Sequence, residues 1–258
     1  MQQVSQNINP DKQVIARRFG KSIRTYEQEG CIQRRIAMKM MRLLKETVQD
    51  SCIHIMEFGC GTGFYSRLLY EELHPEFMVL NDLCSEMEVC LQGLLGEKIK
   101  FLPGDAERIH FPGKFDLITS CSTLQWFHDP KAFINACSKS LNTQKYLAFT
   151  TFGTRNLCEM KELTGYGLSY LSIENLKKIV SDKYEILYME EEISPIYFDS
   201  PMAVLQHLRR TGVTGLGGKS WTRKELTLFN RAYIRKFTQG NNIPLTYHPI
   251  YIIAQKKK

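Results

Sequence analysis

Residues 55–64, "IMEFGCGTGF", place three glycines at alternate positions directly after an apolar run. An apolar strand, a glycine-rich turn and a helix form the first unit of a doubly wound α/β fold, whose ligands bind beyond the carboxyl ends of the strands. Gly59, Gly61 and Gly63 permit a tight turn and a close approach of the backbone to a ligand. The dinucleotide motif would need a glycine where Phe64 stands, and no P-loop lysine follows, so the turn indicates another kind of ligand.

The length and composition are those of a globular chain. Its 258 residues, 43% hydrophobic and 24% charged, suffice for one large α/β domain or two small ones. It contains no run of eighteen apolar residues, and residues 1–20 lack the apolar core of a signal peptide, so we expect no membrane segment and a cytoplasmic location. The eight cysteines form no CxxC pair, which favours buried free thiols over a metal site or disulfides.

The net charge of +7, from 34 basic and 27 acidic residues, is unevenly distributed. Basic residues concentrate in the segments 16–24, 33–42, 207–212 and 217–237. These segments are either solvated helix faces or a surface for an acidic partner. They contain no recognised nucleic-acid motif, so we expect no nucleic-acid partner.

Apolar runs alternate with amphipathic ones through the first 152 residues. Expected strands cover 52–58, 77–81, 99–102, 115–120 and 146–152. Helices are expected over about 31–49, 64–73, 86–95 and 130–141, the third opened by a capping box of Ser85 and Glu88 and the fourth by Asp129 and Pro130. Strands this apolar predict a parallel sheet that is covered by helices on both faces.

The last third departs from this alternation. Two expected strands, 184–193 and 245–254, flank two expected helices that start at Ser200–Pro201 and at the Thr222–Glu225 capping box. We interpret these helices as a cap insertion over about 199–243, above the ligand end of the sheet. With N-terminal helices over about 10–49, the whole chain, 1–258, is expected to form a single domain.

Three carboxylates follow three of the expected strands. Glu57 precedes the glycines, Asp82 lies 19 residues after Gly63, where an acid can bind ribose hydroxyls, and Asp105 lies in "PGDAERI", where it can accept from an exocyclic amine. A nucleoside with a cationic tail fits these acids better than a dinucleotide does. The set resembles the S-adenosylmethionine site of Rossmann-like, class I methyltransferases, which implies a seven-stranded, mostly parallel sheet.

Further segments narrow the resemblance. "LQWF" (124–127), "HLRRTGV" (207–213) and "PLTYH" (244–248) are similar to the malonyl-[acyl-carrier-protein] O-methyltransferases of biotin synthesis, and the similarity extends over roughly residues 14–255. One departure is the absence of a glycine before the fifth expected strand, where Asn142 can supply a left-handed conformation. The resemblance implies transfer of a methyl group from S-adenosylmethionine to malonyl-acyl-carrier protein or malonyl-CoA, without a metal.

The resemblance also implies which residues bind the cofactor. The methionine part would lie among the residues of the turn, the ribose and adenine against the later acids, and the sulfonium near the end of the fourth strand. The residues so assigned are Glu57, Gly59, Cys60, Gly61, Gly63, Asp82, Leu83, Asp105, Ala106 and Ser122.

The acceptor chemistry favours neutral donors. A malonyl carboxylate, with a pKa of about 4, is ionised at pH 7, so methyl transfer to it needs positioning and exclusion of water but no general base. The candidates are Tyr26, Gln33, Gln125 and Tyr247, with Trp126 as a wall against water. Each has a structural alternative: Tyr26 can cover the cofactor, Gln33 can cap a turn, and Trp126 can belong to the core.

Two further residues are assigned to the substrate with the same reservation. Arg209 can bind the thioester carbonyl or the phosphopantetheine phosphate, or it can be solvated, and His248 can contact substrate or simply lie at a strand start. The positive segments suit an acidic acyl carrier protein. Two other functions stay open: methyl transfer to a small phenol, quinone or other metabolite, and binding of S-adenosylmethionine without catalysis.

Overall fold

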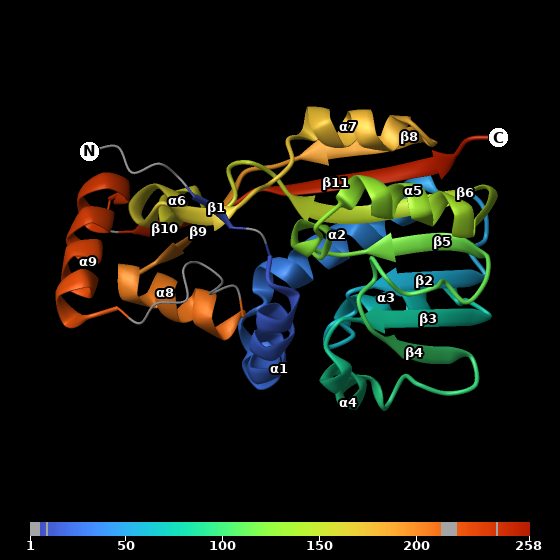
Figure 1. Ribbon diagram of the computed structural model, residues 1–258, viewed down its shortest axis with the longest axis horizontal. Coiled ribbons are helices and arrows are strands. Elements are labelled where there is room, and N and C mark those ends of the chain that lie inside the picture. Colours follow the sequence, from blue (N-terminus) through green and yellow to red (C-terminus); the bar gives the residue numbers. More distant parts are fainter. Residues whose placement is uncertain (1–5, 9, 213–220, 241) are drawn as a thin grey trace.

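A twisted sheet with the strand order β4-β3-β2-β5-β6-β11-β8 forms the centre of the molecule (Figure 1). The computed structural model describes the backbone of residues 6–8, 10–212, 221–240 and 242–258, and the side chains of these residues except 6–8, 22 and 24–28. In sheet order the strands are β4 (Ile99–Pro103), β3 (Phe77–Asp82), β2 (His54–Phe58), β5 (Phe115–Ser120), β6 (Leu141–Phe152), β11 (Pro249–Lys256) and β8 (Tyr184–Glu191).

The sheet is mostly parallel, as expected. Neighbours from β4 to β6 pair in parallel, and β11 alone runs antiparallel to its neighbours β6 and β8. The strand order reverses between β2 and β5, because the chain moves outward through β3 and β4 and then returns to the other side of β2. Such a switch point is where open α/β sheets bind ligands, and the glycine turn follows β2 directly at this point.

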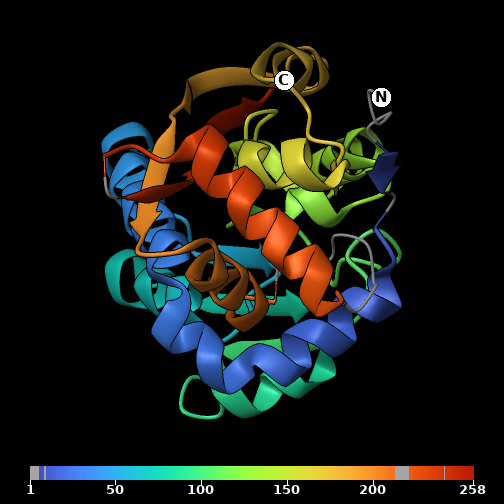
Figure 2. The ribbon, with the colours of Figure 1, turned by 90° about the vertical axis from the view of Figure 1, so that its left-hand side faces the viewer.

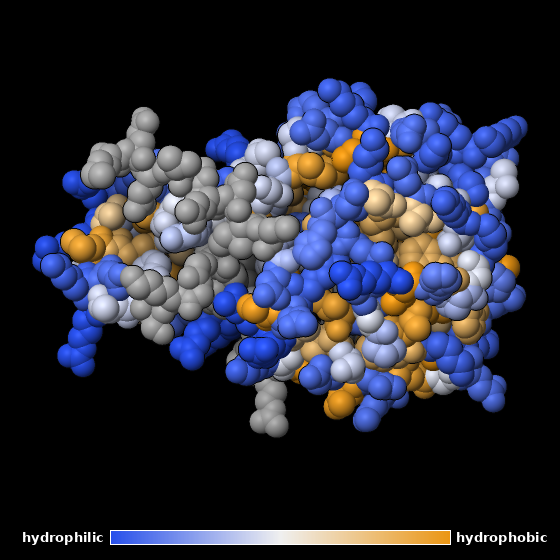
Figure 3. All heavy atoms as spheres, in the orientation of Figure 1, coloured by the Kyte–Doolittle hydropathy of each residue, from blue (hydrophilic) through white to orange (hydrophobic). Residues whose placement is uncertain are grey.

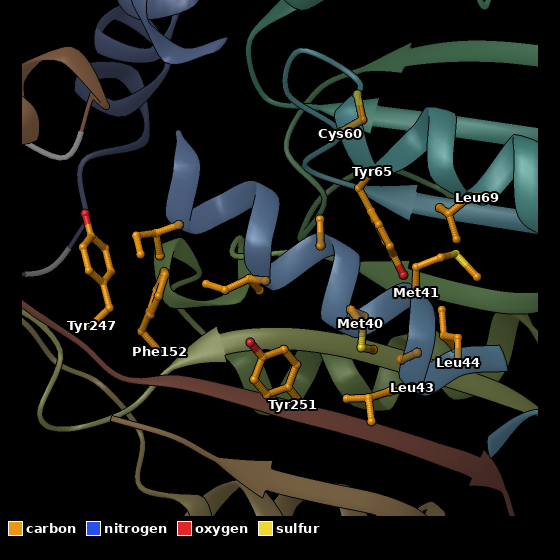
Figure 4. Packing of buried hydrophobic residues seen from close by; sticks show 14 of the residues in the cluster. Met40, Met41, Leu43, Leu44, Cys60, Tyr65, Leu69, Phe152, Tyr247 and Tyr251 are labelled. Atoms are coloured by element: carbon orange, nitrogen blue, oxygen red, sulfur yellow. The ribbon is translucent and has the colours of Figure 1, made fainter. Parts of the chain in front are cut away.

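Helices cover both faces of the sheet. Along β2, Ile55 packs into one hydrophobic cluster with α2 (Cys31–Thr47) and α3 (Phe64–Leu73), whereas Met56 packs into a second cluster with α5 (Pro130–Ser140) and α7 (Ile173–Ser181). Successive side chains of a strand point to opposite faces, so a strand buried on both faces is apolar throughout. Figure 4 shows Met40, Met41 and Leu44 of α2 packed between Tyr65 and Tyr251.

A smaller assembly lies beyond the carboxyl ends of the parallel strands (Figure 1). In it β9 (Ser194–Phe198) pairs antiparallel with β10 (Ile243–Tyr247), and α8 (Pro201–Arg210) contacts α9 (Arg223–Phe237) and α1 (Lys12–Glu29). Figure 2 shows α9 running diagonally across the front of the molecule, with α8 beside it and α1 below them. The remaining elements are β1 (Gln6–Ile8), β7 (Tyr166–Leu168), α6 (Cys158–Thr164) and the 3-10 helix η2 (Leu124–Trp126).

The helix starts expected from capping residues are confirmed in three places. Asp129 accepts from the Ala132 amide at 2.9 Å and Ser200 accepts from the Ala203 amide at 3.2 Å. Thr222 forms the expected capping box with Glu225. These helix starts could be predicted because a capping bond joins residues three apart in the sequence.

Other expectations are wrong. The stretch 245–254 is two strands in two sheets, β10 and β11, separated at His248; the run is buried throughout, so its hydropathy does not show where the chain changes sheet. The helix expected over 86–95 is only the 3-10 helix η1 (Ser85–Met87) followed by α4 (Glu88–Leu91), and Ser85 bonds Glu86 and does not form the expected capping box with Glu88. The left-handed residue before the core of β6 is Gln144, with φ +58°, and not Asn142.

Candidate active site

The glycine turn after β2 combines three left-handed residues with different roles. Gly59 has φ +64°, and a Cβ there would lie 2.2 Å from Thr123 Oγ1. Gly61 has φ +53°, and a Cβ there would project into open space with no atom within 4 Å. Gly63 has φ +83° and precedes α3, facing Leu91 and Arg67. Gly59 and Gly61 therefore border the ligand space, whereas Gly63 serves the packing of the helix.

One cavity, here called the nucleoside cavity, lies beside Gly59 and Gly61 at the ends of β3 and β4. Its walls come from those strand ends and, on the opposite side, from Lys12, Ile15, Ala16 and Phe19 of α1. The predicted cofactor residues that line it are Gly59, Gly61, Asp82, Leu83, Asp105, Ala106 and Ser122. Helix α1 thus covers a site whose floor was predicted from the sequence.

Asp82 is fixed at the end of β3 by backbone amides. Its Oδ2 accepts from the Gly61 amide at 2.9 Å and its Oδ1 accepts from the Cys84 amide at 2.8 Å. Burial raises the pKa of this carboxyl, while the amides act in the opposite direction. Each carboxylate oxygen has more than one lone pair, so Asp82 can also accept from ligand hydroxyls.

Asp105 has a partner that was not foreseen. Its Oδ1 accepts from Lys12 Nζ at 2.5 Å, and Lys12 also pairs with Glu107. Burial opposes ionisation of Asp105, but the hydrogen bonds from Lys12 and the Glu107 amide outweigh it, so its pKa is lowered. The other oxygen, Oδ2, has Arg108 Nε at 3.7 Å, beyond hydrogen-bond distance, and can accept from an amine.

A second cavity borders the same turn, and we name it the methionine cavity after the part of the ligand that the sequence predicts there. It shares Gly59, Gly61 and Ser122 with the first and adds Glu57, Cys60, Gln33 and Arg34, among others. Glu57 is 1% exposed and its Oε2 has no hydrogen-bond partner among the described residues. Burial raises the pKa of Glu57 to about 8, and the neighbouring Asp82 carboxylate adds to the effect. A cationic ligand beside this buried carboxyl would favour its ionised form.

A third, smaller space, the acceptor cavity, brings four of the predicted substrate residues together. Gln33, Gln125, Trp126 and Tyr247 all line it, although they come from α2, η2 and β10. The other lining residues are Phe19, Ser122, Phe152, Asn156, Leu157, Tyr170 and Thr211. No acidic or basic side chain occurs among these lining residues.

Ser122 lines all three cavities, which makes it the junction of the site. It has φ +56°, a left-handed conformation that is uncommon for a residue other than glycine. Its amide donates to Thr150 Oγ1 at 2.9 Å, and its carbonyl accepts from Gln125 Nε2 at 2.5 Å. These bonds hold the loop after β5 at the point where the three spaces meet.

The other groups that line the acceptor cavity differ in the contacts they make within the protein. Gln33 has a buried Oε1 with no hydrogen-bond partner among the described residues. Trp126 packs edge-on against Phe19 at 5.8 Å between ring centroids. The hydroxyl of Tyr247 lies 2.9 Å from His207 Nε2, and Figure 4 shows its ring beside Phe152.

Three predicted substrate residues are not among the described residues that line the acceptor cavity. The His248 ring lines none of the three cavities: its Nδ1 accepts from the Arg155 amide at 3.0 Å and its Nε2 contacts Glu191 at 2.8 Å. Arg209 is exposed on α8 and lines none of them either. The side chain of Tyr26, in α1, lies outside the described residues.

Several lining residues were not predicted. Lys12 and Phe19 of α1, Arg34 of α2 and the loop residues Asn156 and Tyr170 carry no motif of their own. The one available signal was the basic character of 16–24 and 33–42, which we interpreted only as surface charge.

No helix in the part of the chain that the structure describes has the length and apolarity to cross a membrane.

Comparison with known proteins agrees with this geometry. Residues 56–149 match a family model described as a methyltransferase domain. Two solved structures share the fold: the YcgJ protein of Bacillus subtilis (TM-score 0.62, 16% identity, 86% of this chain and 99% of that one) and the N-methyltransferase NodS of Bradyrhizobium japonicum in complex with S-adenosyl-L-homocysteine (TM-score 0.54, 12% identity, 91% and 99%).

Similarity over nearly the whole chain is more specific. The malonyl-[acyl-carrier protein] O-methyltransferase of Bacteroides thetaiotaomicron is 51% identical over 259 residues, covering 96% of this chain and 99% of the relative. The protein of the same name from Haemophilus influenzae is 36% identical over 247 residues, covering 95% of each. The resemblance inferred from the motifs is thereby confirmed: the chain is a methyltransferase and belongs to the malonyl-[acyl-carrier protein] O-methyltransferase family.

Proposed function

We propose that this enzyme transfers the methyl group of S-adenosylmethionine to the free carboxylate of malonyl-acyl-carrier protein, giving the malonyl methyl ester that primes pimelate synthesis for biotin. Family membership supports the reaction. The structural observation that carries the proposal is the junction at Ser122. There the two cofactor cavities meet an acceptor cavity whose lining, as far as the structure describes the chain, includes no charged side chain.

The residues of the first two cavities fit S-adenosylmethionine. The unpartnered Oε2 of Glu57 suits the ammonium group of the methionine part, and Asp82 suits the ribose hydroxyls. Asp105 Oδ2 suits the exocyclic amine of adenine, while Lys12 holds the other oxygen. When bound, the cofactor supplies a methyl group that its sulfonium has already activated.

The acceptor cavity suits a carboxylate that is to act as a nucleophile. A charged arginine or lysine clamp would lower the reactivity of the carboxylate, whereas neutral amide and hydroxyl donors can orient it and leave its charge in place. Gln33 and Tyr247 provide such groups, and Phe19, Trp126 and Phe152 exclude water. A phenol acceptor would instead need a base, and the described residues that line this cavity include no histidine, lysine or carboxylate.

The outer elements suit an acidic carrier protein. We infer that α8, α9, β9 and β10 act with α1 as a cap over the acceptor cavity, which Thr211 at the end of α8 helps to line. The exposed basic residues of the cap include Arg209, Arg223, Lys224, Arg231 and Arg235. A positive surface accelerates encounter with a negative partner. None of the eight cysteines, all of which the structure describes, forms a disulfide, which fits work in a reducing cytoplasm.

The test is methyl transfer from labelled S-adenosylmethionine to malonyl-acyl-carrier protein, with malonyl-CoA, acetyl-acyl-carrier protein and a simple phenol as parallel acceptors. We expect label in an ester that mild base or an esterase removes, from the malonyl donors only. Transfer to the phenol, or binding of the cofactor with no transfer to any acceptor, would contradict the proposal.

A further inference from the structure

Two uncharged side chains in the acceptor cavity, Asn156 and Tyr170, form a hydrogen-bond chain whose direction is fixed. The His248 amide donates to Asn156 Oδ1 at 3.2 Å, and Asn156 Nδ2 donates to the Tyr170 hydroxyl oxygen at 2.9 Å. A backbone amide can only donate, so Asn156 must present its oxygen to His248 and its NH₂ group to Tyr170. The amide orientation therefore follows from the network itself.

The same reasoning fixes the proton of Tyr170. Because Asn156 Nδ2 is a donor, the hydroxyl of Tyr170 is the acceptor in that bond, and its own proton must point elsewhere. No described residue receives a hydrogen bond from it. Burial raises the pKa of Tyr170 to about 12, so the proton stays in place at neutral pH. Tyr170 is among the residues that line the acceptor cavity.

The support behind Asn156 is rigid. Asn156 is 4% exposed in the loop between β6 and α6, and its amide donates to the Gly153 carbonyl at 3.0 Å. His248 holds the same loop through three bonds, since its carbonyl accepts from Gly153, its amide donates to Asn156 and its Nδ1 accepts from Arg155. The backbone amide of His248 thus positions Asn156, while its carbonyl and ring hold the neighbouring residues of the loop.

We propose that Tyr170 donates its hydroxyl proton in a hydrogen bond to the malonyl carboxylate, and that Asn156 is the positioning residue that turns this proton toward the substrate. The inference rests on the proposed function and names a contact for that site. A carboxylate is the strongest acceptor that a malonyl thioester offers, and a hydroxyl donor can orient it without adding a positive charge. The contact would distinguish malonyl from acetyl thioesters, because the acetyl group has no carboxylate.

The experiment measures binding and turnover separately. Dissociation constants of malonyl- and acetyl-acyl-carrier protein are measured in the presence of S-adenosylhomocysteine, which permits no methyl transfer, for the wild type, Tyr170→Phe, Asn156→Ala and the double variant. We expect Tyr170→Phe to reduce the preference for malonyl over acetyl about tenfold, the loss of one charge-assisted hydrogen bond. The affinity for S-adenosylmethionine should change less than about twofold, because Tyr170 does not line the cofactor cavities.

A double-mutant cycle separates positioning from a general structural role. Asn156→Ala should reduce the malonyl preference in the wild type but by less than about twofold in the Tyr170→Phe background, since Asn156 acts through the hydroxyl. Asn156→Asp provides a second variant: it keeps an oxygen for the His248 amide but cannot donate to Tyr170, and we expect a loss at least as large as that of Asn156→Ala.

The outcomes distinguish the two proposals. An unchanged malonyl preference in Tyr170→Phe, or equal weakening of both thioesters, would overturn the assignment of Tyr170 even if the wild type methylates malonyl-acyl-carrier protein. A wild type that prefers malonyl through Tyr170 but transfers no methyl group would instead overturn the proposed function and leave the binding contact standing.

Discussion

The cofactor half and the acceptor half of the site are built in different ways. The cofactor residues Glu57, Gly61, Asp82 and Asp105 lie at or just beyond the carboxyl ends of three neighbouring parallel strands, so each is fixed by the end of its own strand. The acceptor residues come from α1, α2, η2, β10 and the loops around α6 and β7, and they meet only when those elements pack. The cofactor residues are positioned by the strands beside them in the sequence, whereas the acceptor residues are brought together only by tertiary contacts.

This difference has an energetic counterpart. The cofactor half contains Glu57 and Asp82, whose burial raises their pKa values; a cationic ligand would favour their ionised forms and so offset the cost of burial. The acceptor half is lined by uncharged groups that can hold an anion without neutralising it. The two ligands thus enter environments of opposite character that touch at Ser122. Changes in the cofactor half should have the larger effects, since charge and backbone shape are both involved there.

The largest effect is expected from Gly61→Val. The new side chain would project into the cofactor space and force a β-branched residue to a φ of +53°. We expect S-adenosylmethionine binding to fall more than about 100-fold, by steric exclusion together with backbone strain. Calorimetry measures the affinity, and circular dichroism checks the fold.

Gly93→Val is the matched control, because a Cβ at this exposed glycine also meets no atom within 4 Å. It should bind the cofactor as the wild type does. Normal affinity in Gly61→Val, with a normal spectrum, would show that the turn does not face the cofactor.

Asp82→Ala should have the next largest effect. The variant loses an acceptor for ribose hydroxyls and also the bond that holds the Gly61 amide. A charge-assisted hydrogen bond contributes about 1.5–3 kcal/mol, so we expect S-adenosylmethionine to bind about 10- to 150-fold more weakly. Asp82→Asn, which keeps one acceptor oxygen, should lose less than Asp82→Ala; equal affinities in all three proteins would remove Asp82 from the site.

This contrast explains why more of the cofactor half than of the acceptor half could be predicted from the sequence. Gly59, Gly61 and Asp82 were identifiable because their type and spacing follow the strands directly. The Ser200 cap of α8 and the Thr222–Glu225 capping box of α9 were likewise predictable, because each joins residues that are close in the sequence. Asn156 and Tyr170 carry no such pattern, because they meet through a loop that His248 holds from a separate strand junction.

The unforeseen contacts have the same cause. His248 was expected either to contact substrate or to lie at a strand start; the chain changes sheet between β10 and β11, and the His248 ring contacts the Arg155 amide and Glu191. The pairing of Asp105 with Lys12 joins residues 93 positions apart. No local periodicity contains information about a contact of that length.

The pH dependence of cofactor affinity tests whether Glu57 pairs with the ammonium group of S-adenosylmethionine. Its pKa is raised to about 8, so below that pH the carboxyl is protonated in the free enzyme and must lose its proton to pair with the cofactor ammonium. Affinity for S-adenosylmethionine should therefore rise with pH, by at most about tenfold per unit, up to about pH 8. Above it the ligand's own amino group, with a pKa of about 8, loses its charge and the affinity falls again.

Titration of affinity by calorimetry between about pH 6 and 9 checks this, with two buffers of different ionisation enthalpy to count released protons. Glu57→Gln should lose the rising limb and the proton release while retaining the fall at high pH. A wild-type affinity that is flat from pH 6 to 8 would mean that Glu57 does not meet the ammonium group.

The smallest effect concerns the surface outside both halves. Arg209 is exposed on α8 and lines none of the three cavities, so Arg209→Glu should act through the carrier protein alone. Arg210 pairs with Glu29 of α1 at 2.7 Å and is better left unchanged, because its removal would disturb the cap. We expect Arg209→Glu to raise the KM for malonyl-acyl-carrier protein about three- to tenfold at low salt, with the difference shrinking as salt screens the charges.

The design of this last experiment separates docking from chemistry. The KM values for S-adenosylmethionine and malonyl-CoA should stay near the wild-type values, since neither ligand has an acidic protein surface. Lys177→Glu is the matched control: it makes the same charge change on α7, which Figure 1 places against the sheet and away from α8. If the carrier protein docks at the cap, only Arg209→Glu shows the salt-dependent loss. Equal losses in both variants would reflect net charge, and a loss shared by malonyl-CoA would place Arg209 in the acceptor half.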